Sequence, residues 1–451
     1  MAKMVLIGAG SLQFGAGMLG DVFQSDVLVD SDIVLNDINE AAALRTLKLA
    51  QDYIDAKGLK QRVTVEADLE KALLGADFVV ISIEVGDRFK LWDMDWKIPQ
   101  QYGIPQVYGE NGGPGGLFHS LRIIPPILEI CSKIMSVAPK AWVFNYSNPM
   151  SRICTTVHRA FPELRFIGMC HEIASLERHL APVLGTTRDK IHFQAAGLNH
   201  FSVLANVHYT DSGEDALAEA IAKAPDYFSK LVGYSEILNY SRQEGRVVET
   251  EGWMEVDLTG ITKARDWSDR WLFRDVLKRF GVLPITGDSH FGEYIQWAHE
   301  VSDHRGILDF YTLYRHHLGD IPPVIRDELH ERVVPIMEGL LTGNRYEEGA
   351  VNIPNKGFID GLPEWMVVEV PAHIDADGVH GIHVDLPPGF RGLLSNQIGV
   401  HELTAEAVLQ KSRDYVIQAL LVDPVVPVSK CIPDLVDQMI TEQSPWLDYL
   451  A

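Results

Sequence analysis

The sequence predicts an α/β protein, with a doubly wound and mostly parallel sheet in its first half and an α+β arrangement in its second. Three observations lead to this prediction. Short apolar runs alternate with helical patterns up to about residue 170, which favours a parallel sheet with helices on both faces. A glycine turn follows the first apolar run. Polar residues follow the later runs, at the edge where such sheets bind ligands.

Length and composition favour a globular protein of two or three structural units. The chain has 451 residues, 46% of them hydrophobic, and a formal charge of −23. We expect one unit over residues 1–175 and another over residues 176–451. The acidic balance argues against nucleic acid or an anionic membrane as a partner, and no apolar run is long enough to span a bilayer. Four cysteines without a disulfide pattern, and no apolar leader, favour the cytoplasm.

The first strand is predicted at residues 3–8, and the turn GAGS and a helical pattern follow it. Gly8 and Gly10, with Ser11 beside them, would let the backbone approach a pyrophosphate at the helix N-terminus. The third glycine of the GxGxxG fingerprint is missing, because Gln13 stands in its place. This signal is therefore weak when taken alone.

The second strand, Asp32–Asp37, ends in an acid. Asp37 is placed to bind the ribose of NAD, and the alternative is a cap for the next helix. A helix over Glu40–Lys57 and strands at Val63–Glu66 and Ala76–Ile83 complete a β-α-β-α-β unit. The order of strand, glycine turn, helix, strand and acid predicts a Rossmann-like NAD-binding domain.

A long loop is expected after Ile83. It includes Glu84 and Arg88 and ends in the glycine-rich stretch YGENGGPGG (108–116), before a helix near Leu117. Glycine and proline expose the backbone in such a stretch. It either closes over a cofactor or serves as an ordinary connection, and the spacing leaves both open.

Two further strands bring polar groups to the same edge of the sheet. The strand WVFN precedes Asn148, and the strand RFIG precedes Cys170, His171 and Glu172. A thiol, an imidazole and a carboxylate side by side can bind a metal ion or move protons. The alternative is a buried, inert cysteine.

In the second half, residues 267–281 predict an amphipathic helix that ends on a glycine, with a cap at Asp266 or Ser268. Asp275 lies beside the apolar stripe of this helix, which makes it a candidate for a buried functional acid. The alternative is an exposed acid paired with Arg279 at i+4.

Five motifs occur in an order that resembles one known family. They are GAGS (8–11), GGPGG (112–116), NYSNP (145–149), GMCHE (168–172) and GLNHF (197–201). Together they are similar to glycoside hydrolase family 4, the NAD- and manganese-dependent glycosidases, and further matches extend over nearly the whole chain. That family is related to lactate and malate dehydrogenases. The resemblance thus implies a fold of that kind for the first half, and a catalytic, substrate and oligomerisation domain for the second.

The resemblance implies a role for each candidate residue. A divalent ion, usually Mn²⁺, would bind the thiolate of Cys170 and the imidazole of His200, with sugar oxygens completing its shell. Asp275 takes the position of the base, held by Asp or Tyr in different members, and His171 or Glu172 would protonate the leaving group. The remaining assignments are NAD binding by Gly8, Gly10, Ser11, Asp37, Glu84 and Asn148, and substrate binding by Arg88, Asn148 and His290.

The implied reaction is a redox-assisted elimination, not hydrolysis by a carboxylate pair. NAD⁺ takes hydride from C3 of the sugar, a base removes the C2 proton, the C1 substituent leaves, and hydride returns after water adds. An unphosphorylated α-hexoside is expected, because members acting on 6-phosphosugars commonly have Cys-Asp or Cys-Asn where this chain has Cys-His-Glu. An α-glucoside or α-galactoside ranks first, followed by an α-galacturonide whose carboxylate pairs with Arg88 or Arg274.

Two rival functions stay open at this level. One is an NAD-dependent dehydrogenase of a hydroxy acid or polyol, which would release NADH. The other is a sugar-sensing protein without turnover. We expect a small glycoside as the binding partner and a homodimer or homotetramer as the assembly. The exact sugar, the aglycone and the preferred metal are not determined.

Overall fold

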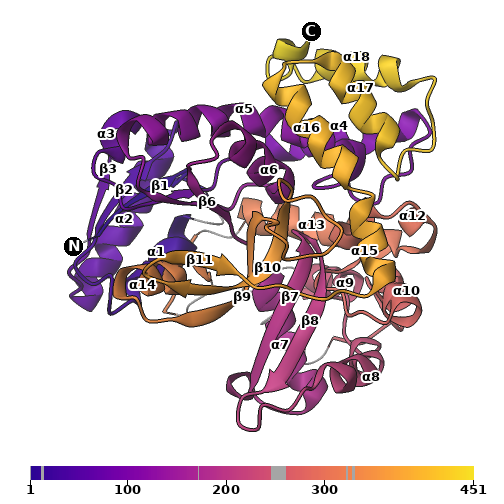
Figure 1. The fold of residues 1–451 in the computed structure, drawn as a ribbon, viewed down its shortest axis with the longest axis horizontal. Helices are drawn as coiled ribbons and strands as arrows, with labels where there is room; N and C mark the ends of the chain where they lie inside the picture. The colour runs from indigo at the N-terminus through magenta and orange to yellow at the C-terminus, as the bar shows by residue number, and fades with distance from the viewer. Residues whose placement is uncertain (1, 12–14, 171, 245–260, 321–322, 328–330) are drawn as a thin grey trace.

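One continuous sheet runs through the protein, and helices cover it (Figure 1). The computed structural model describes residues 2–11, 15–170, 172–244, 261–320, 323–327 and 331–451. The strand order is β3-β2-β1-β4-β5-β6-β9-β10-β7-β8, with β11 beside β10. The strands are β1 (Lys3–Ile7), β2 (Asp32–Asn36), β3 (Arg62–Val65), β4 (Phe78–Ile81), β5 (Trp142–Asn145), β6 (Arg165–Gly168), β7 (Ile191–Leu198), β8 (Phe201–Tyr209), β9 (Tyr346–Pro354), β10 (Val367–Asp375) and β11 (Gly378–Gly381).

Helices surround this sheet on both faces and at its ends. Within the described ranges, no helix combines the length and the apolar character that a bilayer crossing requires. The helices are α1 (Gly15–Phe23), α2 (Glu40–Lys57), α3 (Leu69–Leu73), α4 (Arg88–Gln101), α5 (Gly113–Val137), α6 (Met150–Ala160), α7 (Glu172–Leu184), α8 (Leu217–Phe228), α9 (Tyr234–Glu244), α10 (Trp271–Phe280), α11 (Asp288–Phe291), α12 (Ala298–Val301), α13 (His304–Asp320), α14 (Val333–Thr342), α15 (Pro388–Ser395), α16 (Ile398–Leu409), α17 (Arg413–Val422) and α18 (Ile432–Glu442).

The first six strands pair in parallel, which confirms the predicted fold class. A strand such as β4 is buried at every residue, because helices cover both faces of a parallel sheet. Helix α2 has the predicted bounds and ends at Gly58, which adopts the left-handed conformation. The prediction of a long loop after Ile83 is wrong, because α4 occupies part of this segment. Asp87 caps this helix by accepting a hydrogen bond from Lys90 N.

The N-terminus of helix α10 also differs from the prediction. The helix begins at Trp271, and neither Asp266 nor Ser268 caps it. The carboxylate of Asp288 instead accepts hydrogen bonds from two backbone N–H groups in the first turn, at 3.0 and 2.9 Å. The predicted glycine end is confirmed, with Gly281 in the left-handed conformation. A residue distant in the sequence therefore supplies the N-terminal cap.

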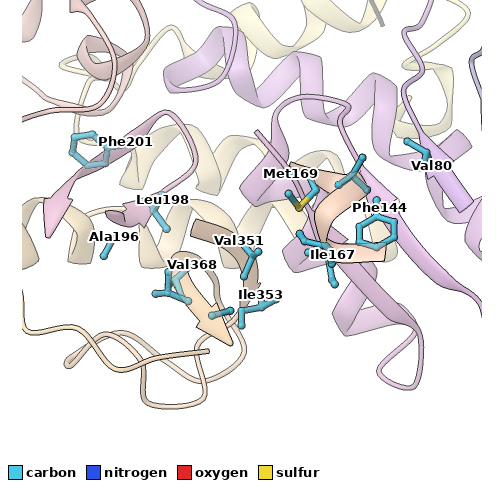
Figure 2. Packing of buried hydrophobic residues seen from close by; sticks show 14 of the residues in the cluster. Val80, Phe144, Ile167, Met169, Ala196, Leu198, Phe201, Val351, Ile353 and Val368 are labelled. Carbon is cyan, nitrogen blue, oxygen red and sulfur yellow. The ribbon is translucent and has the colours of Figure 1, made fainter. Parts of the chain in front are cut away.

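The sheet changes from parallel to antiparallel where Gly168 of β6 pairs with Asn352 of β9. A side chain at Gly168 would not fit, because its Cβ would lie 2.6 Å from the sulfur of Met150. Apolar side chains continue across this junction. Figure 2 shows Val80, Phe144 and Ile167 from the parallel strands and Val351, Ile353 and Val368 from the antiparallel ones, all members of one core cluster.

The C-terminal helices return to the first half of the chain. Helices α16 and α17 pack against α5, and α18 contacts α4, as Figure 1 shows. Buried side chains of α17 and α18 share a core cluster with those of α5 and α6. Residues 398–442 thus pack on the unit predicted for residues 1–175. The division of the chain at residue 175 stays a prediction.

Gly8→Ala is expected to destabilise the protein strongly. Gly8 has a φ of 83°, and a Cβ there would lie 2.0 Å from the carbonyl oxygen of Ser82. The left-handed backbone and the backbone clash together should lower the free energy of unfolding by roughly 3 kcal/mol or more. Gly58→Ala is the matched control, because its φ is 65° but nothing lies within 4 Å of the added Cβ. Urea denaturation should show a loss of only about 1 kcal/mol for the control, and equal losses would contradict the expectation.

Candidate active site

A cavity of about 1150 Å³ opens at the carboxyl ends of the parallel strands, the edge at which such sheets bind ligands. Pockets for one small ligand typically enclose ~300–1,000 Å³. This cavity therefore has room for a cofactor and a second molecule. Ten residues predicted from the sequence line it: Gly8, Gly10, Ser11, Asp37, Glu84, Arg88, Asn148, Glu172, His200 and His290.

The glycine turn forms one part of the cavity wall. The Asp37 carboxylate accepts hydrogen bonds from Gly10 N at 2.8 Å and from Asn39 N at 2.7 Å. The cap of α2 is Asn39, so the alternative role of Asp37 as that cap is wrong. A Cβ at Gly8 would clash with the backbone of Ser82, so this tight turn requires a glycine, as a pyrophosphate-binding turn does. These residues fit a dinucleotide.

Another part of the wall is a set of paired charges around Glu110. Arg88 Nη2 lies 2.7 Å from one Glu110 oxygen, and Arg88 Nε lies 3.7 Å from Glu84. His290 Nε2 lies 3.0 Å from the other Glu110 oxygen. Burial raises the pKa of Glu110, but His290 and Arg88 outweigh it and hold the pKa well below its ordinary value. Glu110 is therefore an ionised acid between Arg88 and His290.

The two candidate metal ligands come from separate elements. His200 lies at the tip of the β7–β8 hairpin, with a φ of 62°, and lines the cavity. Cys170 follows β6 and is not among the lining residues, and its sulfur accepts a hydrogen bond from Glu172 N at 3.4 Å. Burial, and then the charges of Glu369 and Glu172, raise the pKa of the Cys170 thiol well above its usual value.

This donor set fits a divalent ion that takes part of its shell from other molecules. Carboxylates beside the Cys170 thiol favour a cation there, and thiolate and imidazole are both ligands for borderline ions. In the part of the chain that the structure describes, no three metal-binding side chains already form a cluster. Water or substrate oxygens would have to supply the remaining ligands.

One predicted catalytic residue, Asp275, is not among the residues that line the cavity, and another, His171, cannot be placed. Asp275 lies on α10, and its side chain is only 13% exposed because Arg274 and Arg279 pair with it at 3.4 and 3.2 Å. The i+4 pairing with Arg279 is thus present, and the catalytic role of Asp275 stays a prediction without geometric support. His171 lies outside the described residues.

The cavity also contains residues that the sequence did not single out. Glu110, Tyr234 and Asp269 all line it. Glu110 belongs to the glycine-rich stretch 108–116, which could have pointed to it. Asp269 has a φ of 63° and accepts a hydrogen bond from Tyr234 N. No spacing marks Asp269, because its burial arises from the packing of helices distant in the sequence.

Comparison with known proteins agrees with this geometry. The model of the family described as Family 4 glycosyl hydrolase matches residues 3–186, and the model of its C-terminal domain matches residues 195–426. An α-glucosidase of Erwinia rhapontici is 63% identical over 99% of both chains. An α-galacturonidase of Thermoanaerobacterium saccharolyticum is 27% identical over 98% of this chain and 96% of its own. A crystal structure of a 6-phospho-α-glucosidase from gut microorganisms, in complex with NAD and Mn²⁺, is 19% identical. It superposes with a TM-score of 0.73 over 99% of this chain and 98% of its own, which shows a shared fold.

Asp269→Asn should change how stability depends on pH. Burial raises the pKa of Asp269 from 3.8 to about 7. As the pH rises from 5 to 7, the unfolded chain keeps this carboxylate ionised while the folded protein holds it neutral. The wild type therefore loses stability across this window, and the variant, which cannot ionise, does not. The difference in free energy of unfolding, Asp269→Asn minus wild type, should therefore rise by roughly 2 kcal/mol between pH 5 and pH 8.

Urea denaturation at several pH values measures this difference. Asp211→Asn, which removes the same charge at an exposed turn, controls for the change in net charge. A stability difference between Asp269→Asn and wild type that stays constant from pH 5 to pH 8 would rule out a raised pKa at Asp269.

Proposed function

This chain belongs to glycosyl hydrolase family 4, and we propose that it hydrolyses an unphosphorylated α-glucoside with NAD and Mn²⁺ as cofactors. One observation carries this proposal: the 63% identity, over 99% of both chains, to an enzyme named as an α-glucosidase. The two family models together match both halves of the chain. The large cavity, with its dinucleotide-binding turn and one candidate metal ligand, His200, in its wall, supports the same function.

The pairing of Arg88 and Arg274 gives no support to a uronide as the substrate. Arg88 is held by Glu110 at 2.7 Å and by Glu84 at 3.7 Å, so its guanidinium is already neutralised. Arg274 pairs with Asp275 and does not line the cavity. Neither arginine considered for a uronate carboxylate is therefore placed to bind one, whereas a hexose needs only hydrogen bonds.

We assign the cofactors to the two parts of the wall that fit them. NAD would lie against Gly8, Gly10 and Asp37, and the metal ion would bind Cys170 and His200. When bound, NAD accepts and returns a hydride, and the ion polarises oxygens of the sugar. The protein itself binds and orients NAD and the metal ion, and its side chains transfer the protons.

Proton transfer requires groups that reach the cavity. His290, which lies 3.0 Å from the Glu110 carboxylate, is our candidate for the leaving-group acid, together with Glu172. For removal of the C2 proton, Asp269 and Tyr234 line the cavity, whereas the ion pairs of α10 engage Asp275. We therefore place the base at Asp269 or Tyr234. His171 stays a candidate from the sequence alone.

We also propose a cytoplasmic homo-oligomer, either a dimer or a tetramer. All four cysteines are free thiols, which suits a reducing compartment. Light scattering of the purified protein would give the subunit number, and a monomeric mass would remove this part of the proposal.

The enzyme should prefer neutral α-glucosides. With NAD⁺, Mn²⁺ and a thiol reductant present, kcat/KM for nitrophenyl α-glucoside should exceed that for its 6-phosphate by roughly ten-fold or more, because a misfitted group typically costs at least that factor. The charge of Glu172 in the wall also disfavours a phosphate. The α-galactoside and the α-galacturonide serve as comparison substrates. Faster turnover of the 6-phosphate or of the uronide would contradict the substrate assignment.

Turnover in D₂O should place deuterium at C2 of the released sugar. A carboxylate-pair glycosidase never breaks that bond and would leave none. NADH should not accumulate stoichiometrically, yet enzyme stripped of NAD should be inactive until NAD⁺ is added. Mass spectrometry measures the deuterium at C2, and absorbance at the NADH band measures the accumulation of NADH. Net NADH production would instead identify a dehydrogenase, and sugar binding without any turnover would indicate a sensor.

A further inference from the structure

A polar cluster with three imidazoles lies on the antiparallel part of the sheet, apart from the cavity. His192 of β7 stands directly opposite His208 of β8 in the sheet register. Glu347 of β9 stands opposite His373 of β10 in the same way. All four side chains are half-buried, and none lines the cavity.

Glu347 orients one ring of the histidine pair. Its carboxylate lies 2.7 Å from His192 Nε2 and accepts a hydrogen bond from Gln194 Nε2 at 2.6 Å. A carboxylate acceptor on Nε2 holds the proton there, which leaves the lone pair of His192 on Nδ1.

The second ring lies at a distance that suits a shared ligand. The ring centres of His192 and His208 are 5.0 Å apart, with the planes tilted by 51°. Two imidazoles bound to one tetrahedral ion at ~2.0–2.1 Å have ring centres roughly 5 Å apart. Imidazole is a preferred ligand of zinc, copper and nickel ions.

We propose that His192 and His208 form a second metal site, for a divalent transition ion of the Zn²⁺ type, with Glu347 as the carboxylate that orients His192. Metal-binding histidines commonly donate their other ring N–H to a carboxylate, and His192 has that arrangement. Two protein ligands form the site, and water completes it.

The site would clamp the open end of the β7–β8 hairpin. His192 and His208 pair near the open ends of β7 and β8, and His200 lies between these strands at the hairpin tip. Figure 1 shows the two strands side by side. Because the two ends are separated by the length of the hairpin, an ion here acts on stability and not on the reacting sugar.

The test uses untagged, EDTA-treated full-length enzyme on an immobilised Ni²⁺ column, which reaches surface histidines but not an enclosed cavity. His208→Gln and His192→Gln should each elute at an imidazole concentration at least two-fold below that of wild type. His304→Gln is the matched control. It disrupts another pair, His299 and His304, with ring centres 4.3 Å apart, and should elute like wild type.

Calorimetric titration with Zn²⁺ gives the second measurement. Wild type should bind one more ion than His208→Gln, and Glu347→Gln should keep that ion with ~10–100-fold weaker affinity. Activity of the NAD- and Mn²⁺-loaded His208→Gln variant should stay at the wild-type level, which reports that it is folded. Equal elution and equal Zn²⁺ stoichiometry for wild type, His192→Gln and His208→Gln would overturn the proposal.

Discussion

The active site depends on how one buried carboxylate is satisfied. Glu369 of β10 is 2% exposed and accepts hydrogen bonds from Ser202 Oγ at 2.6 Å, Asn352 Nδ2 at 3.1 Å and Asn199 Nδ2 at 3.3 Å. A buried charge is costly unless hydrogen bonds or an opposite charge compensate it. Losing any of these donors would leave part of that cost uncompensated, so the strands that supply them are held in one register.

The same network positions the two candidate metal ligands. Asn199 directly precedes His200 at the hairpin tip, and Asn352 also donates to the carbonyl of Gly168 at 3.4 Å, two residues before Cys170. The thiol and the imidazole are thirty positions apart in sequence, but both are attached to groups that converge on Glu369. The change from parallel to antiparallel pairing at Gly168 thus lies two residues before one candidate metal ligand, Cys170.

Most of the secondary structure of the first half could be predicted from the sequence, because local patterns are sufficient there. Buried parallel strands are short apolar runs, and α2 has an asparagine at one end and a glycine at the other. Helix α4 could not be predicted in this way. Its buried Trp92 packs edge-on against Tyr311 of α13 at 5.0 Å, so a partner more than 200 residues away stabilises it. Helix α10 depends in the same way on Asp288 for its cap.

The family, the Rossmann-like half, and the glycines, Asp37 and Asn148 at the cavity were determined by the sequence alone. They follow strand ends, and the carboxyl ends of parallel strands necessarily share one edge. Only the tertiary structure decided that Arg88 is neutralised by Glu110, that Asp275 does not line the cavity, and that Asp269 is buried. Charge pairing and burial depend on which distant elements pack together, and the pattern of neighbours along the chain does not contain that information.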